Sequence, residues 1–263
     1  MRIIAGEFRR RKLISPPDAE TTRPIPDRVK GALFNLMRGH IEGASVFDAF
    51  AGTGAVALEA VSRGAERVVC IERDRKIASI LQRNVDQFDA RDRVRLIQTD
   101  ALGPTAFAAC PDPCTIAFFD PPYPLIRERA GWERLKAHAA KILPKLSDDG
   151  FLIIRTPWPL THETESHPVE VEGVEHAPSQ TDPEGDEVIE LDLDGLSDEE
   201  ADAVLEAFEA EARAEPDATP ANEPADLSIE GADGPETRVY RQTALQLYVR
   251  SAGPQSGVPV APE

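Results

Sequence analysis

The chain has 263 residues and a formal net charge of −18, with 29 Lys and Arg against 47 Asp and Glu. This length is enough for one α/β domain with appendages, and no stretch approaches the roughly 20 apolar residues that a membrane helix needs. The three cysteines, Cys70, Cys110 and Cys114, are too few and too irregularly spaced for a disulfide framework, and the five histidines do not cluster at metal-ligand spacing.

Residues 1–44 are predicted to form a hairpin and a helix. Short strands are expected at 2–4 and 12–14, and a loop rich in proline and threonine follows over 15–26. Apolar residues at helical spacing predict a helix from Asp27 that ends near Gly39. The basic N-terminus lacks the apolar segment and cleavage site of a secretory signal, so we expect a cytoplasmic protein.

Strands and helices alternate from residue 45 onward. We predict strands at 45–50, 67–72, 93–98, 115–120 and 151–155, helices at 55–62, 74–88 and 132–143, and a closing strand at 243–249. This alternation favours a parallel sheet with helices on both faces. The domain would therefore comprise residues 45–159 and 238–250, with an insert at 160–237 and a disordered tail at 251–263.

The insert explains the negative charge of the chain. Residues 163–236 contain 26 Asp and Glu and a single basic residue, Arg213, whereas the rest contains 28 Lys and Arg and 21 Asp and Glu. The protein is thus a mildly basic body with an acidic insert, a pattern that concerns solubility and partners rather than fold. Within the insert we predict a helix at 197–214, started by a capping box, and a strand at 187–193. The remainder is expected to be a linker or a disordered loop.

A glycine-rich turn follows the first strand of the predicted sheet. Asp48 ends the strand, and Ala51, Gly52 and Gly54 form the turn. This position is the ligand crevice of a doubly wound sheet, and glycines let the backbone approach a cofactor closely. The third glycine of a dinucleotide-binding turn is absent, and an acidic residue suits an ammonium group better than a pyrophosphate. The methionine part of S-adenosylmethionine offers such a group; a purely structural turn is the alternative.

Two further acidic residues follow the next strands. Glu72 ends the second strand, where a carboxylate can accept hydrogen bonds from both ribose hydroxyls of a cofactor. Asp100 follows the third strand, at the analogous position for an adenine amino group. Each has a structural alternative, because Glu72 or Asp74 could cap the next helix and Asp100 could cap the turn before Leu102.

The most specific motif is Asp120-Pro121-Pro122-Tyr123, which directly follows the apolar fourth strand. An exocyclic amine of a base is a poor nucleophile, because its lone pair is delocalised into the ring. The Asp120 carboxylate and the Pro121 carbonyl can accept its N–H groups, localise the lone pair and take up the proton. Tyr123 offers a ring on which an extracted base can stack. The motif therefore predicts methylation of a base amino group, and an acidic strand end with a proline turn is the alternative.

Basic residues near the N-terminus complete the candidate site. Arg23 and Arg28 could meet phosphates or close over the cofactor. The basic residues expected to meet the RNA backbone are Arg2, Arg9, Arg10, Arg11, Lys12, Arg28 and Lys30. A solvated helix start and a solvated charged face are the alternatives.

Together and in this order, the motifs resemble the RsmD-type 16S ribosomal RNA guanine-N2 methyltransferases. The resemblance covers about residues 1–157 and 238–250. It includes Met1–Gly6, Arg10–Leu13, Thr22–Pro24, Asp27–Val29, Ala32–Asn35, Asp48–Gly54, Leu58–Ala60, Ser62–Ala65, Asp120–Tyr123 and Thr243–Tyr248. The N-terminal segment makes it specific, because Asp-Pro-Pro-Tyr also occurs in DNA adenine and cytosine methyltransferases and in tRNA enzymes.

The resemblance implies a Rossmann-like, seven-strand class I methyltransferase sheet with a reversed last strand, preceded by a hairpin and a helix. It also implies S-adenosylmethionine as cofactor and one guanine of 16S rRNA in the small ribosomal subunit as substrate, with ribosomal proteins in the docking surface. By carry-over, Asp48, Gly52 and Gly54 would hold the methionine part, Glu72 the ribose, and Asp120 and Tyr123 the guanine. We further expect a monomer, with no metal and no membrane partner.

The acidic insert departs from this family. It should repel RNA unless it points away, and it could instead mimic RNA, bind a basic ribosomal protein, or be a tolerated surface insertion. Other functions stay open as well. They are amino methylation of DNA or tRNA, an inactive ribosome-assembly factor that retains the fold, and glutamine methylation of a protein.

Overall fold

The computed structural model describes residues 1–16, 25–163, 180–181, 187–188 and 222–251. The chain divides into two compact units, Met1–His162 with Pro224–Glu263, and Glu163–Glu223. In the second unit, β7 (Gln180–Thr181) and β8 (Glu187–Val188) form an antiparallel pair. The predicted helix at 197–214, most of the predicted strand at 187–193 and the tail from residue 252 lie outside the described residues.

The first unit is built around a seven-stranded sheet with the order β10-β11-β5-β4-β1-β2-β3. Its strands are β1 (Ser45–Asp48), β2 (Arg67–Glu72), β3 (Val94–Gln98), β4 (Cys114–Phe119), β5 (Leu146–Pro157), β10 (Ala232–Tyr240) and β11 (Thr243–Arg250). Neighbouring strands from β5 to β3 are parallel, whereas β11 is antiparallel to both β5 and β10. The predicted seven-strand sheet with a reversed last strand is therefore confirmed.

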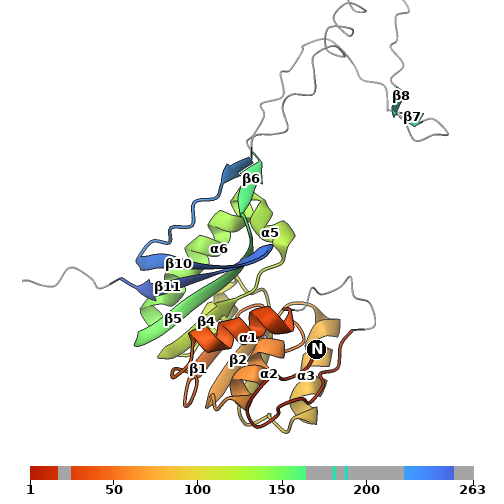
Figure 1. The fold of residues 1–263 in the computed structure, drawn as a ribbon, viewed down its shortest axis with the longest axis vertical. Coiled ribbons are helices and arrows are strands. Elements are labelled where there is room, and N and C mark those ends of the chain that lie inside the picture. The colour runs from red at the N-terminus through yellow and green to blue at the C-terminus, as the bar shows by residue number, and fades with distance from the viewer. Residues whose placement is uncertain (17–24, 164–179, 182–186, 189–221, 252–263) are drawn as a thin grey trace, which may run out of the picture. The chain divides into compact units, whose positions relative to one another are not determined.

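Helices cover both faces of this sheet (Figure 1). One face carries α1 (Asp27–Leu36), α2 (Ala55–Ser62) and α3 (Arg75–Gln87); the other carries α4 (Pro104–Ala109), α5 (Tyr123–Arg127) and α6 (Arg129–Ile142), which η1 (Leu143–Lys145) follows. None of the helices that the structure describes has the length and apolar character needed to cross a bilayer.

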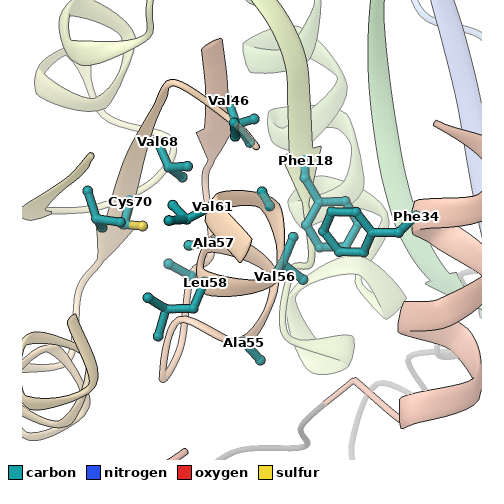
Figure 2. Close-up of a cluster of buried hydrophobic side chains, with 14 of the residues drawn as sticks. Phe34, Val46, Ala55, Val56, Ala57, Leu58, Val61, Val68, Cys70 and Phe118 are labelled. Carbon is teal, nitrogen blue, oxygen red and sulfur yellow. The ribbon is translucent and has the colours of Figure 1, made fainter. Parts of the chain in front are cut away.

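The helix α2 is apolar on nearly every side because the sheet and the N-terminal segment enclose it. All of its residues are buried. Figure 2 shows its alanines and valines beside Val46 of β1 and Val68 of β2, with Phe34 of α1 and Phe118 of β4 extending the same cluster. This packing fixes the glycine-rich turn at the start of α2 against the end of β1.

Several elements differ from the prediction. The expected N-terminal hairpin is reduced to a single bridge between Arg2 and Lys12. The helices α4 and α5 were not predicted, because segments of six and five residues are too short to reveal helical periodicity. The edge strand β10 was missed as well, since it is mostly exposed and its sequence lacks the alternation of a half-buried strand.

The acidic segment is shorter than the expected 160–237, because residues 224–237 pack against the first unit. The carbonyl of Asp226 accepts from Trp132 Nε1 at 2.7 Å, and its carboxylate pairs with Lys136 Nζ at 2.9 Å. Tyr248 donates to the carbonyl of Leu227 at 2.8 Å, and Ile229 is buried. Residues 224–237 therefore belong to the first compact unit.

A buried carboxylate on α2 anchors the N-terminal segment. Glu59 accepts the backbone N–H groups of Ile4 at 2.7 Å and Ala5 at 3.0 Å. It also pairs with Lys30 Nζ at 3.3 Å and Arg63 Nε at 2.8 Å. Burial lowers the pKa of Lys30, and the charge of Glu59 opposes that effect. The N-terminal residues are therefore attached to α1 and α2 by one largely buried polar cluster.

Glu59→Gln is expected to lower the free energy of unfolding by about 3–5 kcal/mol, because it leaves the buried ammonium of Lys30 without a counter-charge. Urea unfolding followed by circular dichroism measures this change. The matched control is Glu7→Gln, since Glu7 forms an exposed pair with Arg93. Equal stability of the two variants would contradict the anchoring role of Glu59.

Two deletions test the boundary of the insert. Replacing residues 163–223 with a short Gly-Ser linker should leave the melting temperature near that of the full chain. Deleting 163–236 also removes Asp226, Ile229 and half of β10, so we expect a midpoint lower by about 5–15 °C. Differential scanning calorimetry of both variants measures the difference, and equal midpoints would place the boundary back near residue 237.

Candidate functional site

Charged side chains lie in a row along one edge of the sheet. Because the parallel strands all end at this edge, they bring together residues from distant parts of the sequence. In the spatial order of the strands from β5 to β3, the row consists of Arg155, Asp120, Asp48, Glu72 and Asp100. We call these five residues the edge row.

The edge row borders a cavity of about 890 Å³. This volume lies within the range of small-molecule sites in proteins. The cavity wall includes these predicted site residues: Asp48, Ala51, Gly52, Glu72, Asp100, Asp120, Pro121 and Tyr123. Gly54 does not line the cavity, and Arg23 lies outside the described residues.

Asp48 is the most unusual residue of the site. Its side chain is buried, and within the described part of the chain neither carboxylate oxygen has a hydrogen-bond partner. Burial, together with the nearby charges of Asp120 and Glu72, raises the pKa of Asp48 to about 8. The backbone N–H groups of Phe50 and Ala57 oppose this effect, although neither has the geometry of a hydrogen bond to the carboxylate. A buried carboxylate without partners is costly, which makes this position suited to a ligand that brings a cation or several donors. An ammonium group has this chemistry.

The glycine-rich turn is held in place by its own backbone and by Glu72. Gly52 and Gly54 have backbone φ values of +54° and +85°, which residues other than glycine rarely adopt. The carboxylate of Glu72 accepts the N–H of Gly52 at 3.0 Å with one oxygen and that of Asp74 at 2.7 Å with the other. Burial raises the pKa of Glu72. Each oxygen retains a second lone pair, so Glu72 can still accept a pair of hydroxyl groups.

Helix capping belongs to a neighbour of Glu72. The carboxylate of Asp74 accepts the N–H groups of Lys76 at 2.7 Å and Ile77 at 3.0 Å at the start of α3. Asp100 has a local contact too, since it accepts the N–H of Leu102 at 3.0 Å while it borders the cavity. Asp100 therefore combines the expected position in the site with the capping contact that was its alternative.

Asp120 pairs with an arginine that was not predicted from the sequence to belong to the site. Arg155 Nε donates to Asp120 Oδ1 at 2.6 Å, and both side chains are largely buried. Burial raises the pKa of Asp120, and the charge of Arg155 opposes that effect. Arg155 ends the apolar segment of the fifth strand, just as charged residues end the other parallel strands. This shared position is the sequence signal that could have identified it.

Tyr123 is held by a hydroxyl from the other end of the chain. Thr243 Oγ1 donates to the carbonyl of Thr156 at 2.9 Å, and the phenol of Tyr123 lies 3.1 Å from the same Oγ1. Since the threonine hydroxyl has only one hydrogen, the phenol is the donor in this second contact. The ring of Tyr123 is thereby fixed at the cavity wall.

Among the basic residues predicted to meet RNA, Lys30 is buried and pairs with Glu59, so it is not available to a phosphate. The exposed ones are Arg2, Arg9, Arg10, Arg11, Lys12 and Arg28. Arg11 differs from the others, because its guanidinium lies 4.2 Å from the ring centroid of Phe88 and donates to the carbonyl of Gln87. Arg11 therefore has a structural role whatever its contact with RNA.

Comparison with known proteins identifies related chains. A family model described as “Conserved hypothetical protein 95” matches residues 1–169. “Ribosomal RNA small subunit methyltransferase D” of Escherichia coli (strain K12) is 39% identical over 123 residues, which are 47% of this chain and 60% of the relative. The protein of the same name from Haemophilus influenzae is 34% identical over 124 residues, 47% and 64% of the two chains. These matches confirm the predicted resemblance, although the chain spans less than two thirds of either relative.

A solved structure shares the fold. “Putative methyltransferase yhhF” from Escherichia coli aligns with a TM-score of 0.57 and 24% identity, over 96% of this chain and 98% of that chain. At this level of identity the likeness supports the fold alone.

Asp48→Asn is expected to stabilise the protein in the absence of ligands. The pKa of Asp48 in the folded protein is about 8, against an ordinary value of 3.8, so the stability of the wild type falls as the pH rises between these values. The advantage of the variant in the free energy of unfolding should grow across this window to roughly 1–3 kcal/mol. Urea titrations at several pH values measure it.

The control is Asp86→Asn on α3. Arg91 lowers the pKa of Asp86, so the effect of removing this exposed carboxylate should be constant above the ordinary value of 3.8 and should diminish only as the pH falls below it. An effect of Asp48→Asn that is the same at all pH values would contradict the buried, unpartnered state of Asp48.

Proposed function

The chain belongs to the family described as “Conserved hypothetical protein 95”, and from this membership we propose that it methylates the exocyclic N2 amine of one guanine in 16S rRNA. The methyl donor in this proposal is S-adenosylmethionine, and the substrate is the small ribosomal subunit. The names of the two relatives support the substrate. The observation that carries the proposal is that Asp120 and Tyr123 border the same cavity as the unpartnered carboxylate of Asp48.

The cofactor fits the residues on one side of the cavity. The buried carboxylate of Asp48 would receive the ammonium group of the methionine part, and Gly52 leaves the backbone open to it. Glu72 would accept the ribose hydroxyls, and Asp100 the adenine amino group. When bound, S-adenosylmethionine supplies an electrophilic methyl group on a sulfonium and leaves as the neutral thioether.

The base fits the other side of the cavity. The carboxylate of Asp120 accepts an N–H of the guanine amine, which localises the lone pair on the nitrogen as the N–C bond forms. The same carboxylate then takes up the proton that the amine releases. The carbonyl of Pro121 is the second acceptor, and the ring of Tyr123 is the surface on which the extracted base stacks.

Exposed cations of the N-terminal segment would bind the RNA backbone. We propose Arg9, Arg10, Lys12 and Arg28 for phosphate contacts, with Arg11 sharing this role and a structural one. In this proposal Arg23 closes over the cofactor, and ribosomal proteins of the small subunit form part of the docking surface.

Methyl transfer to isolated small subunits tests the proposal. Subunits from a strain that lacks the protein should accept radiolabelled methyl groups saturably from the wild type. Asp120→Ala is expected to lower the rate by about 10²–10⁴-fold, because it removes the acceptor for the amine proton. Asp149→Ala is the matched control, since this carboxyl is exposed at 71% and lies away from the cavity wall.

Two further measurements make the result specific. Asp120→Ala should still bind S-adenosylhomocysteine in calorimetry, because Asp48 and Glu72 are unchanged. Transfer to duplex DNA or to tRNA, without transfer to small subunits, would replace the rRNA proposal with one of the alternative substrates. Absence of transfer to any nucleic acid would favour an assembly factor.

A further inference from the structure

Arg155 is the cation of the edge row, and the chemistry proposed above gives it no role. It ends the apolar part of β5, next to β4 in the sheet, and it borders the cavity. Its side chain is only 8% exposed, and that of Asp120 is 15% exposed. Removing a guanidinium from water to this extent is costly, so this pair differs from an exposed surface salt bridge, which forms at little cost and contributes little.

The contact between the two residues is specific. Arg155 Nε lies 2.6 Å from Asp120 Oδ1, the distance of a strong charge-assisted hydrogen bond. This bond uses Oδ1 of Asp120, and the hydrogen bonds among the described residues include none to Oδ2. One carboxylate oxygen is therefore fixed toward β5, and the other remains available.

From this geometry we infer that Arg155 is a positioning residue for methyl transfer, holding Asp120 as a carboxylate with Oδ2 free to accept the amine. The inference rests on the proposed function, because it needs Asp120 to act as the acceptor. It adds a residue from a different strand to the Asp-Pro-Pro-Tyr motif.

The surroundings of Asp120 explain why such a cation is needed. Asp48 faces it from β1, Glu72 lies beyond Asp48 on β2, and the phenol of Tyr123 is on α5. Burial raises the pKa of Asp120 and favours a protonated carboxyl, which could not take up the amine proton. Arg155 on β5 is the charge that opposes this effect.

Arg155 also contacts the second half of the motif. Its guanidinium carbon lies 5.6 Å from the ring centroid of Tyr123, within the range of a cation–π contact. Thr243 holds the phenol at the opposite end of the ring. A single side chain of β5 therefore orients both the acceptor and the stacking surface.

The test is the pH dependence of the single-turnover rate of methyl transfer to small subunits. Without Arg155, Asp120 should protonate at higher pH, so Arg155→Leu should move the acid limb of the profile upward by about one to three pH units. Below the new limb the rate should fall about tenfold for each unit of this shift. Arg155→Lys keeps the charge without the planar fork, so it should restore much of the acid limb.

The matched control is Arg63→Leu, which removes a guanidinium from another buried carboxylate, Glu59, outside the cavity wall. This variant should be less stable but should keep the wild-type acid limb. An unshifted limb in Arg155→Leu, or an equal shift in Arg63→Leu, would overturn the inference. If Arg155→Leu does not fold, Arg155→Gln is measured in its place with the same expected shift and the same contrary result.

The failure of the inference is distinguishable from that of the proposed function. An inactive Asp120→Ala with an unshifted Arg155→Leu removes only the role of Arg155. An Asp120→Ala variant as active as the wild type removes both, because Asp120 is then not the acceptor. Calorimetry with S-adenosylhomocysteine confirms that each variant retains its cofactor site.

Discussion

The site depends on keeping several carboxylates close together in a place from which water is largely excluded. Parallel strands that end at one edge bring Asp48, Glu72 and Asp120 together, and burial raises the pKa of each. Such an arrangement is unfavourable for the protein alone, because like charges repel and Asp48 has no partner within the described residues. A ligand that brings a cation and hydrogen-bond donors to these carboxylates would offset that cost.

The rest of the fold supplies the rigidity that this arrangement requires. The enclosed helix α2 presses the glycine-rich turn against the end of β1, and Glu59 on the same helix binds the N-terminal segment. That segment contributes Met1 and Ile25 to the wall of the cavity. The helix α2 therefore packs the core and also sets the position of the glycine-rich turn at the cavity.

In the order of the chain, the acidic insert comes after all the described residues that line the cavity. It leaves the first unit after His162 and returns at Pro224, beyond the strand that carries Arg155. The contacts of Asp226 and Ile229 close the first unit where the chain returns. Every described residue that lines the cavity lies between Met1 and Arg155. The net charge of the whole chain is therefore a poor guide to the charges at the cavity.

The sequence alone determined the parallel strands, the closing strand and the carboxylates that follow the parallel strands, whereas the reversed direction of the last strand was implied by the family resemblance. Local patterns were sufficient for the parallel strands because apolar segments followed by Asp48, Glu72 or Asp120 leave a signal in the chain. Only the tertiary structure decided which groups face those carboxylates. Arg155 and Thr243 are 35 and 120 residues away from their partners Asp120 and Tyr123. Pairing across that distance depends on strand order, which no local pattern of residues encodes.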